Sequence, residues 1–166
     1  MKVRAFLADG VQAVDGKLYV LGAGWNRLAM RSFPTRHDRI GIGALIVLED
    51  GDAGRHSLTL RLLDPNGAAA TLATDPKGSA RQAVHIGFGA NEPTDGFDET
   101  IVPLALNLDG LVFKEPGTYV FEVRVDETQP ERLSFKVDLV VQDPSRQDLA
   151  DDGSTSAGTT TAAGYL

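Results

Sequence analysis

Strict alternation of apolar and polar residues is clearest near the C-terminal end of the chain. Residues 118–126 place Tyr, Phe and two Val on odd positions, and residues 132–141 place Leu, Phe, Val, Leu and Val there. Because successive side chains of a strand point to opposite faces, this period of two predicts two half-buried β-strands. The connection between them has hairpin length, and its Pro130 stops the strand ladder. A lone hairpin cannot bury its apolar face, so a second sheet must cover it.

The same alternation recurs through much of the preceding chain. It predicts further strands at 2–9, 18–21, 37–48, 57–63, 81–89 and 101–108. Two weaker strands are predicted at 25–33 and 68–73. Residues 37–48 are apolar on both faces in their second half, which is typical of a central strand. Pro103 predicts an edge position or a bulge for the strand that contains it.

Turn sequences separate these segments. Asp15-Gly16 is a strong hairpin signal, because Gly accepts a positive φ at no steric cost. The run Asp64-Pro65-Asn66-Gly67 predicts another turn, and Asp109-Gly110 and Pro116-Gly117 mark two more. Gly22-Ala23-Gly24 predicts a bulge or bend, since the third glycine and helix of a phosphate-binding turn do not follow.

Eight or nine strands with no sustained helical stripe predict an all-β fold, an antiparallel β-sandwich of immunoglobulin-like outline. A closed barrel is the alternative. We expect residues 18–21 to feed a core shared with Tyr119, Phe121 and Phe135, and Trp25 to close one end of it.

Composition limits the domain organisation and the range of functions. The chain has 166 residues, 42% of them hydrophobic, which fits one domain with a substantial core. After Gln142 the residues become polar and small, so residues 1–142 are predicted as the sandwich and 143–166 as a disordered tail. The tail is interpreted as solvating, with a docking peptide ending in Tyr165-Leu166 as the alternative.

Charge and cysteine content favour a cytoplasmic protein without nucleic-acid or membrane partners. The net charge is −7 and no block of Lys and Arg occurs, whereas phosphate backbones and anionic membranes attract clustered positive charge. No apolar run approaches the roughly 20 residues of a spanning helix, and no signal-peptide core begins the chain. There is no cysteine, so the chain has neither a disulfide nor a thiolate ligand or nucleophile.

The sequence contains no set of residues that indicates catalysis. His37, His56 and His85 lie far apart, without the spacing of a common metal site, and no Gly-x-Ser-x-Gly elbow is present. We therefore predict no catalytic, cofactor-binding or metal-binding residues, no cofactor, and no enzyme.

Two weaker signals leave alternatives open. Acidic loops could supply calcium ligands, although solvated turns are commoner. These loops contain Glu49-Asp50-Gly51-Asp52, then Glu92, Asp95, Asp98 and Glu99, and lastly Asp126-Glu127. The aromatic residues Trp25, Tyr19, Phe33 and Phe97 could form an exposed cluster for sugar or protein, although a tryptophan buried in the core is commoner.

Three stretches resemble a family of small uncharacterised actinobacterial proteins of unknown function. They are Phe6-Leu7-Ala8-Asp9 with Gln12 and residues 15–25, residues 102–108 with 116–123, and residues 132–137. The resemblance covers roughly residues 3–141 and implies a stand-alone β-sandwich with no known activity.

We therefore expect a non-enzymatic structural or protein–protein interaction module. Its partner would be another protein, or a second copy bound through an edge strand such as the one containing Pro103. A small-molecule ligand is not expected. The alternative is a ligand-binding sandwich that uses its end loops for calcium or carbohydrate.

Overall fold

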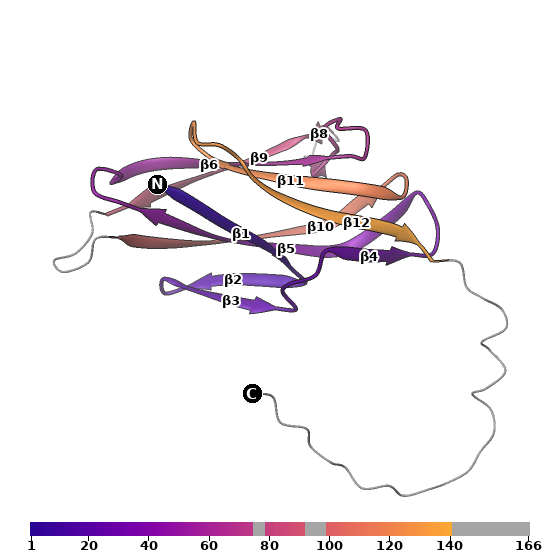
Figure 1. Cartoon of the computed structure of the whole chain (residues 1–166), viewed down its shortest axis with the longest axis horizontal. Helices are drawn as coiled ribbons and strands as arrows, with labels where there is room; N and C mark the ends of the chain where they lie inside the picture. The colour runs from indigo at the N-terminus through magenta and orange to yellow at the C-terminus, as the bar shows by residue number, and fades with distance from the viewer. Residues whose placement is uncertain (75–78, 92–98, 141–166) are drawn as a thin grey trace, which may run out of the picture.

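Two facing β-sheets form the body of the protein in the computed structural model, which describes residues 1–74, 79–91 and 99–140 (Figure 1). The three-stranded sheet has the order β1 (Lys2–Ala8), β5 (Thr35–Leu48), β10 (Thr100–Phe113). The five-stranded sheet has the order β4 (Arg27–Met30), β12 (Glu131–Leu139), β11 (Gly117–Val125), β6 (Gly54–Leu63), β9 (Ala83–Ala90). Neighbouring strands are antiparallel except for β4 and β12, which are parallel.

Two short strand pairs complete the described fold. One is a hairpin of β2 (Gly10–Val14) and β3 (Lys17–Leu21), and the other pairs β7 (Ala73–Thr74) with β8 (Ala80–Arg81). In the described residues no ladder joins the two main sheets, so the all-β sandwich is confirmed and the closed barrel is not formed. The described residues contain no helix, and hence none long and apolar enough to cross a membrane.

The core lies between the two sheets and is built from the alternation seen in the sequence. Four aromatic rings, those of Phe113, Tyr119, Phe121 and Phe135, stack or meet edge to face with centroids 4.9–5.9 Å apart. Trp25 is half-buried and meets Phe135 edge to face at 6.0 Å, as expected of a residue that closes the core. These rings stabilise the core in two ways, because they bury apolar surface and because stacked and edge-to-face ring pairs attract each other.

Several local predictions are confirmed. β5 lies between β1 and β10 as the central strand, and β10, which contains Pro103, is an edge strand. Asp15 and Gly16 have φ of 49° and 69°, the signature of a type I′ hairpin turn. Gly22 and Gly24 also have positive φ, of 62° and 93°, where the chain bends out of β3.

The strand count and two boundaries differ from the predictions. The described chain has twelve strands rather than eight or nine, because several are very short. The strand expected at 68–73 is reduced to an isolated bridge between Leu63 and Ala69, followed by β7. Small alanines in this stretch offer little apolar surface to hold a strand on the core.

Asp109-Gly110 is not a turn, because β10 continues through it to Phe113. Gly110 has φ of 72°, and across it the buried side chains change from the even-numbered Leu106 and Leu108 to the odd-numbered Leu111 and Phe113. Glycine permits this local change of twist, which lets one strand serve the core on both sides of the break.

The prediction that residues 18–21 feed the main core is wrong. β3 lies outside the sandwich, in the hairpin on the solvent side of the three-stranded sheet (Figure 1). Leu18 is half-buried there, whereas Tyr19, Val20 and Leu21 are 55%, 41% and 72% exposed. Hydrophobic alternation identifies a strand but does not say which sheet will cover it. The predicted tail, residues 143–166, lies outside the described residues.

Candidate functional site

The three histidines lie in separate places and do not form a common site. His37 is near the start of β5, 6.5 Å from the ring of Phe113. His85 lies on the outer face of β9, where its Nδ1 is 3.1 Å from the hydroxyl of Thr59. Among the described residues, no group of three or more His, Asp or Glu side chains is placed to hold a metal ion.

His56 links the loop before β6 to the residue that follows β11, at one end of the five-stranded sheet. Its Nδ1 lies 2.8 Å from Asp126 Oδ2 and its Nε2 lies 2.7 Å from the backbone carbonyl of Asp52. Both partners only accept hydrogen bonds, so a doubly protonated ring satisfies both. The hydrogen bond to Asp126 raises the pKa of His56, and the same bond lowers the pKa of Asp126. The centroid of the His56 ring lies 5.3 Å from that of Phe88, so the His56–Asp126 pair is packed against an aromatic side chain of β9.

The acidic side chains of the neighbouring loop also have internal partners. Asp52 accepts from the Met1 ammonium at 2.8 Å, and this bond lowers the pKa of its carboxyl. Glu49 pairs with Lys2 at 2.7 Å, which lowers the pKa of Glu49. Glu49 and Asp52, two of the possible calcium ligands of this loop, are therefore each paired with a different cation of the chain itself. The acidic residues 92–98 lie outside the described residues.

The predicted aromatic cluster is divided in the structure. Trp25 and Phe33 pack against the core, whereas Tyr19 lies exposed on the hairpin, and Phe97 is outside the described residues. The indole Nε1 of Trp25 is buried without a hydrogen-bond partner in the described part of the chain. The three described members of this set, Trp25, Phe33 and Tyr19, therefore do not share one exposed surface.

The β2–β3 hairpin is held firmly against the sandwich by backbone approach and by one side chain. Gly41 and Gly43 face it from β5, and a Cβ on Gly41 would lie 3.0 Å from the Cα of Gly10. A Cβ on Gly43 would clash with the ring of Phe6 and lie 3.0 Å from Leu18 Cδ2. Side chains are therefore excluded where the hairpin approaches most closely.

Asn107 on β10 acts as a clamp for this hairpin. Its Nδ2 donates to the carbonyl of Val11 at 2.8 Å, and its Oδ1 accepts from the amide of Val11 at 3.1 Å. This pair of hydrogen bonds imitates a strand ladder with a single side chain. Val11 is 7% exposed as a result, so the inner side of the hairpin is buried.

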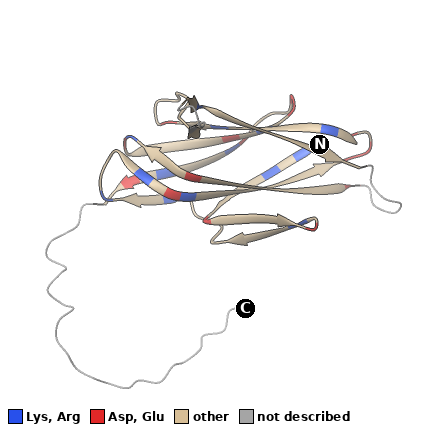
Figure 2. Ribbon diagram, turned by 180° about the vertical axis from the view of Figure 1, so that it is seen from behind, with Lys and Arg blue, Asp and Glu red and all other residues tan. Residues whose placement is uncertain are grey.

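The other side of the hairpin is an exposed apolar surface, which we call the hairpin platform. It consists of Val14, Tyr19 and Leu21, which the strand register places on the side opposite Val11 and which are 38–72% exposed. A shallow hollow of about 290 Å³ lies beside it, lined by residues of both strands. Figure 2 shows that the hairpin carries charge only near its turn. Large apolar side chains grouped on a rigid support are typical of a docking surface.

Two larger hollows, of about 520 and 360 Å³, lie at the C-terminal end of β10. They meet at Thr71 and Val112 and contain side chains of both charges, among them Arg36, Asp109 and Lys114. The Asp109 carboxylate already forms an ion pair with Arg39, whose Nε lies 2.6 Å from Asp109 Oδ1. The lining of these two hollows combines charges of both signs with small residues, and this combination indicates no particular ligand.

The sequence indicated the hairpin but missed that its platform is exposed and that Asn107 holds it. Asn107 alternates with apolar residues and so occupies the polar face of an ordinary strand. The glycines of β5 were the one available signal, because glycine inside a strand marks close approach of another backbone.

Comparison with known proteins identifies the family and supplies no relative of known activity. No curated protein and no solved structure matches the chain, and the immunoglobulin-like outline therefore stays a prediction. One family model matches residues 3–138, nearly all of the described sandwich. The chain belongs to this family, DUF6941, a family of unknown function.

Proposed function

We propose that the protein is a non-enzymatic protein–protein interaction module that docks through its hairpin platform, and that the bound chain is a second copy. The observation that supports this proposal is a firmly clamped hairpin whose outer side leaves Tyr19 and Leu21 largely exposed. Burying such side chains favours association by about 25 cal/mol for each Å² removed from water.

The free edge of β3 gives the docking a geometry. β3 has a strand partner on one side only among the described residues, namely β2. Two copies can therefore join their β3 strands in antiparallel fashion around a twofold axis, with Tyr19 next to the partner's Tyr19. The result would be a four-stranded sheet shared by two copies.

Charge near the platform is self-complementary in this arrangement. An antiparallel pairing centred on Tyr19 brings Lys17 opposite the partner's Leu21 and close to the partner's Asp9, which lies against Gly22. Within the described chain neither Lys17 nor Asp9 has an ion-pair or side-chain hydrogen-bond partner. The twofold axis would form this ion pair twice.

Molar mass in solution tests the proposal directly. Light scattering should give twice the 17.7 kDa chain mass for the wild type, and the chain mass for Tyr19→Asp, which would set two carboxylates side by side on the twofold axis. Val112→Asp is the matched control, because Val112 is 51% exposed near the C-terminal end of β10, five residues beyond the Asn107 that holds the hairpin, and the substitution should leave the dimer intact. A wild type that is monomeric at millimolar concentration, or a dimer equally sensitive to both variants, would exclude a second copy as the occupant.

A charge exchange tests the register. Lys17→Asp and Asp9→Lys should each raise the dimer dissociation constant several-fold, by about the value of one exposed ion pair per site. The double variant should recover most of the lost affinity, because it restores the pair with its signs reversed. Failure to recover would argue against this pairing of β3 strands.

A further inference from the structure

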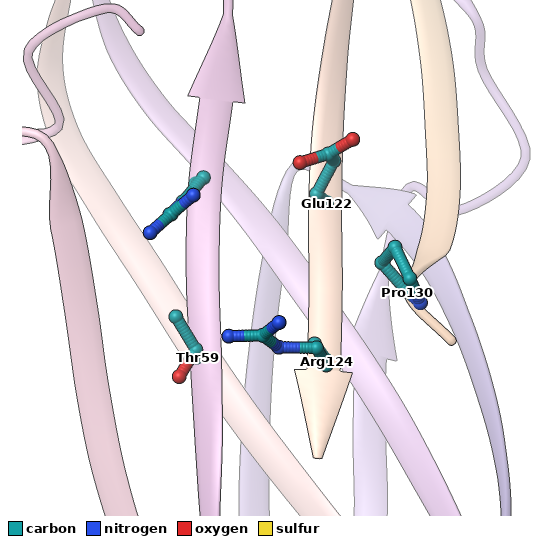
Figure 3. Close-up of a pocket in the computed structure, with 5 residues that line it drawn as sticks. Thr59, Glu122, Arg124 and Pro130 are labelled. Carbon is teal, nitrogen blue, oxygen red and sulfur yellow. The ribbon is translucent and has the colours of Figure 1, made fainter. Parts of the chain in front are cut away.

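A cationic hollow lies on the outer face of the five-stranded sheet, on the other side of the core from the hairpin platform. Its volume is about 40 Å³, and it is lined by Thr59, Arg61, Glu122, Arg124 and Pro130 (Figure 3). Strand register brings these residues together, since Arg124 on β11 pairs with Thr59 on β6 and Glu122 pairs with Arg61. The hollow has room for a carboxylate group or a few waters.

Neither of the two arginines in this hollow has an ion-pair partner in the described part of the chain. Arg61 and Arg124 form no ion pair or hydrogen bond through their side chains with any other part of the described chain. Glu122, the acidic residue of the hollow, is paired instead with Arg132 at 3.4 Å. In Figure 3 the side chain of Arg124 extends toward β6 and Thr59, while the Glu122 carboxylate lies nearer the start of β11.

The surrounding face is positive although the whole chain carries −7. The outward positions of β6, β11 and β12 hold five cationic side chains against two acidic ones. The cationic ones are Arg55, Arg61, Arg124, Arg132 and Lys136, and the acidic ones are Glu122 and Asp138. An exposed face opposite in sign to the rest of the molecule attracts an anionic partner and orients it.

We propose that this face is a second binding surface and that it takes an acidic segment of a protein chain, with one carboxylate in the hollow between Arg61 and Arg124. Guanidinium groups suit carboxylates because their donors match the two oxygens. The hydroxyl of Thr59 lies in the same hollow, 3.1 Å from His85 Nδ1, and it can donate to the carboxylate when the His85 ring donates its Nδ1–H to the Thr59 oxygen. This surface does not depend on the hairpin platform.

An acidic protein segment fits this face better than a nucleic acid does. The outward positions of β6, β11 and β12 hold no Phe, Tyr or Trp on which bases could stack. Glu122 and Asp138 interrupt the positive charge along the track that a phosphate backbone would follow. A carboxylate on a flexible side chain needs only the local hollow.

Fluorescence anisotropy with a fluorescein-labelled hexa-glutamate peptide tests the proposal on the full chain. At low salt the double variant Arg61→Gln/Arg124→Gln should bind about tenfold more weakly than the wild type, the sum of two exposed charge-assisted contacts. The control Arg4→Gln/Arg31→Gln removes the same charge from exposed sites without side-chain partners in the described chain, and should change affinity less than twofold.

Other outcomes would overturn the assignment. Equal losses in the two double variants would show a general charge effect without a site. Tighter binding of a labelled oligothymidine of the same charge would assign the face to nucleic acid, and full competition by inorganic phosphate at micromolar concentration would assign it to a free anion. Tyr19→Asp should bind the peptide like the wild type, which separates this test from that of the hairpin platform.

Discussion

Asn107→Ala should release the β2–β3 hairpin from the sandwich without unfolding the core. The substitution leaves the amide and the carbonyl of Val11 without their partners, at 3.1 and 2.8 Å in the native protein. Each such hydrogen bond contributes about 0.5–1.5 kcal/mol net, so the hairpin should lose about 1–3 kcal/mol of its attachment. The loss is local, because Asn107 points away from the core that Leu106 and Leu108 enter.

Native-state hydrogen exchange measures this attachment residue by residue. The hydrogen-bonded amides of β2 and β3 should exchange about 5- to 150-fold faster in Asn107→Ala, which is the same free energy expressed as a rate ratio. Amides of β11 and β12 should keep their wild-type protection. The dimer expected from the hairpin platform should weaken in parallel, because a detached hairpin presents its β3 edge less often.

Asn26→Ala is the matched control for this experiment. Asn26 is exposed, and its side chain makes no hydrogen bond within the described residues. If the hairpin amides exchange equally fast in the two variants, the clamp does not hold the hairpin. If β11 amides lose as much protection as β2 amides, the hairpin unfolds only with the whole domain and the reasoning about local attachment is refuted.

Three further predictions concern stability. Gly43→Ala should destabilise by about 1–3 kcal/mol in urea unfolding, because its Cβ would overlap Phe6, whereas Gly87→Ala meets nothing within 4 Å and should be neutral or slightly stabilising; equal midpoints would contradict this. Because hydrogen bonding to Asp126 raises the pKa of His56, the stabilisation that His56 provides should be full below about pH 6 and should be lost as pH rises through that raised pKa. The melting temperature should therefore depend less on pH in His56→Gln than in the wild type over this range. The same pH dependence in both proteins would argue against this. Phe135→Ala should cost about 3–5 kcal/mol, since Phe135 is 1% exposed, and a calorimetric loss below about 1 kcal/mol would be incompatible with that packing.

The opening stretch of the chain shows how far local pattern can carry a prediction. Asp15-Gly16 specified its own hairpin turn, and Gly22 and Gly24 specified the bend after β3, because both depend on backbone conformations that few residues accept. Whether the hairpin enters the core depends on the opposite face of β5, where glycine replaces side chains. That contact joins residues far apart in sequence.

The arginines of the outer face illustrate the same division. Arg61, Arg124 and Arg132 are scattered along the sequence, so no block of positive charge suggested a binding surface. Strand register places Arg61 and Arg132 on either side of Glu122, and Arg124 two residues further along β11 on the same face. A run of like charges can be seen in the sequence itself, whereas charges on separate strands form a common face only after the strands have paired.

The sequence by itself determined that this protein is a β-sandwich, where most of its longer strands lie and where most of its turns fall. Alternation and glycine placement act over a few residues, and their preferences hold whatever the rest of the chain does. Only the tertiary structure decided that β3 faces solvent, that Asn107 clamps Val11 and that three arginines share a face. Those features arise from the packing of distant strands, whose register and sheet membership are set by the summed burial of the whole core.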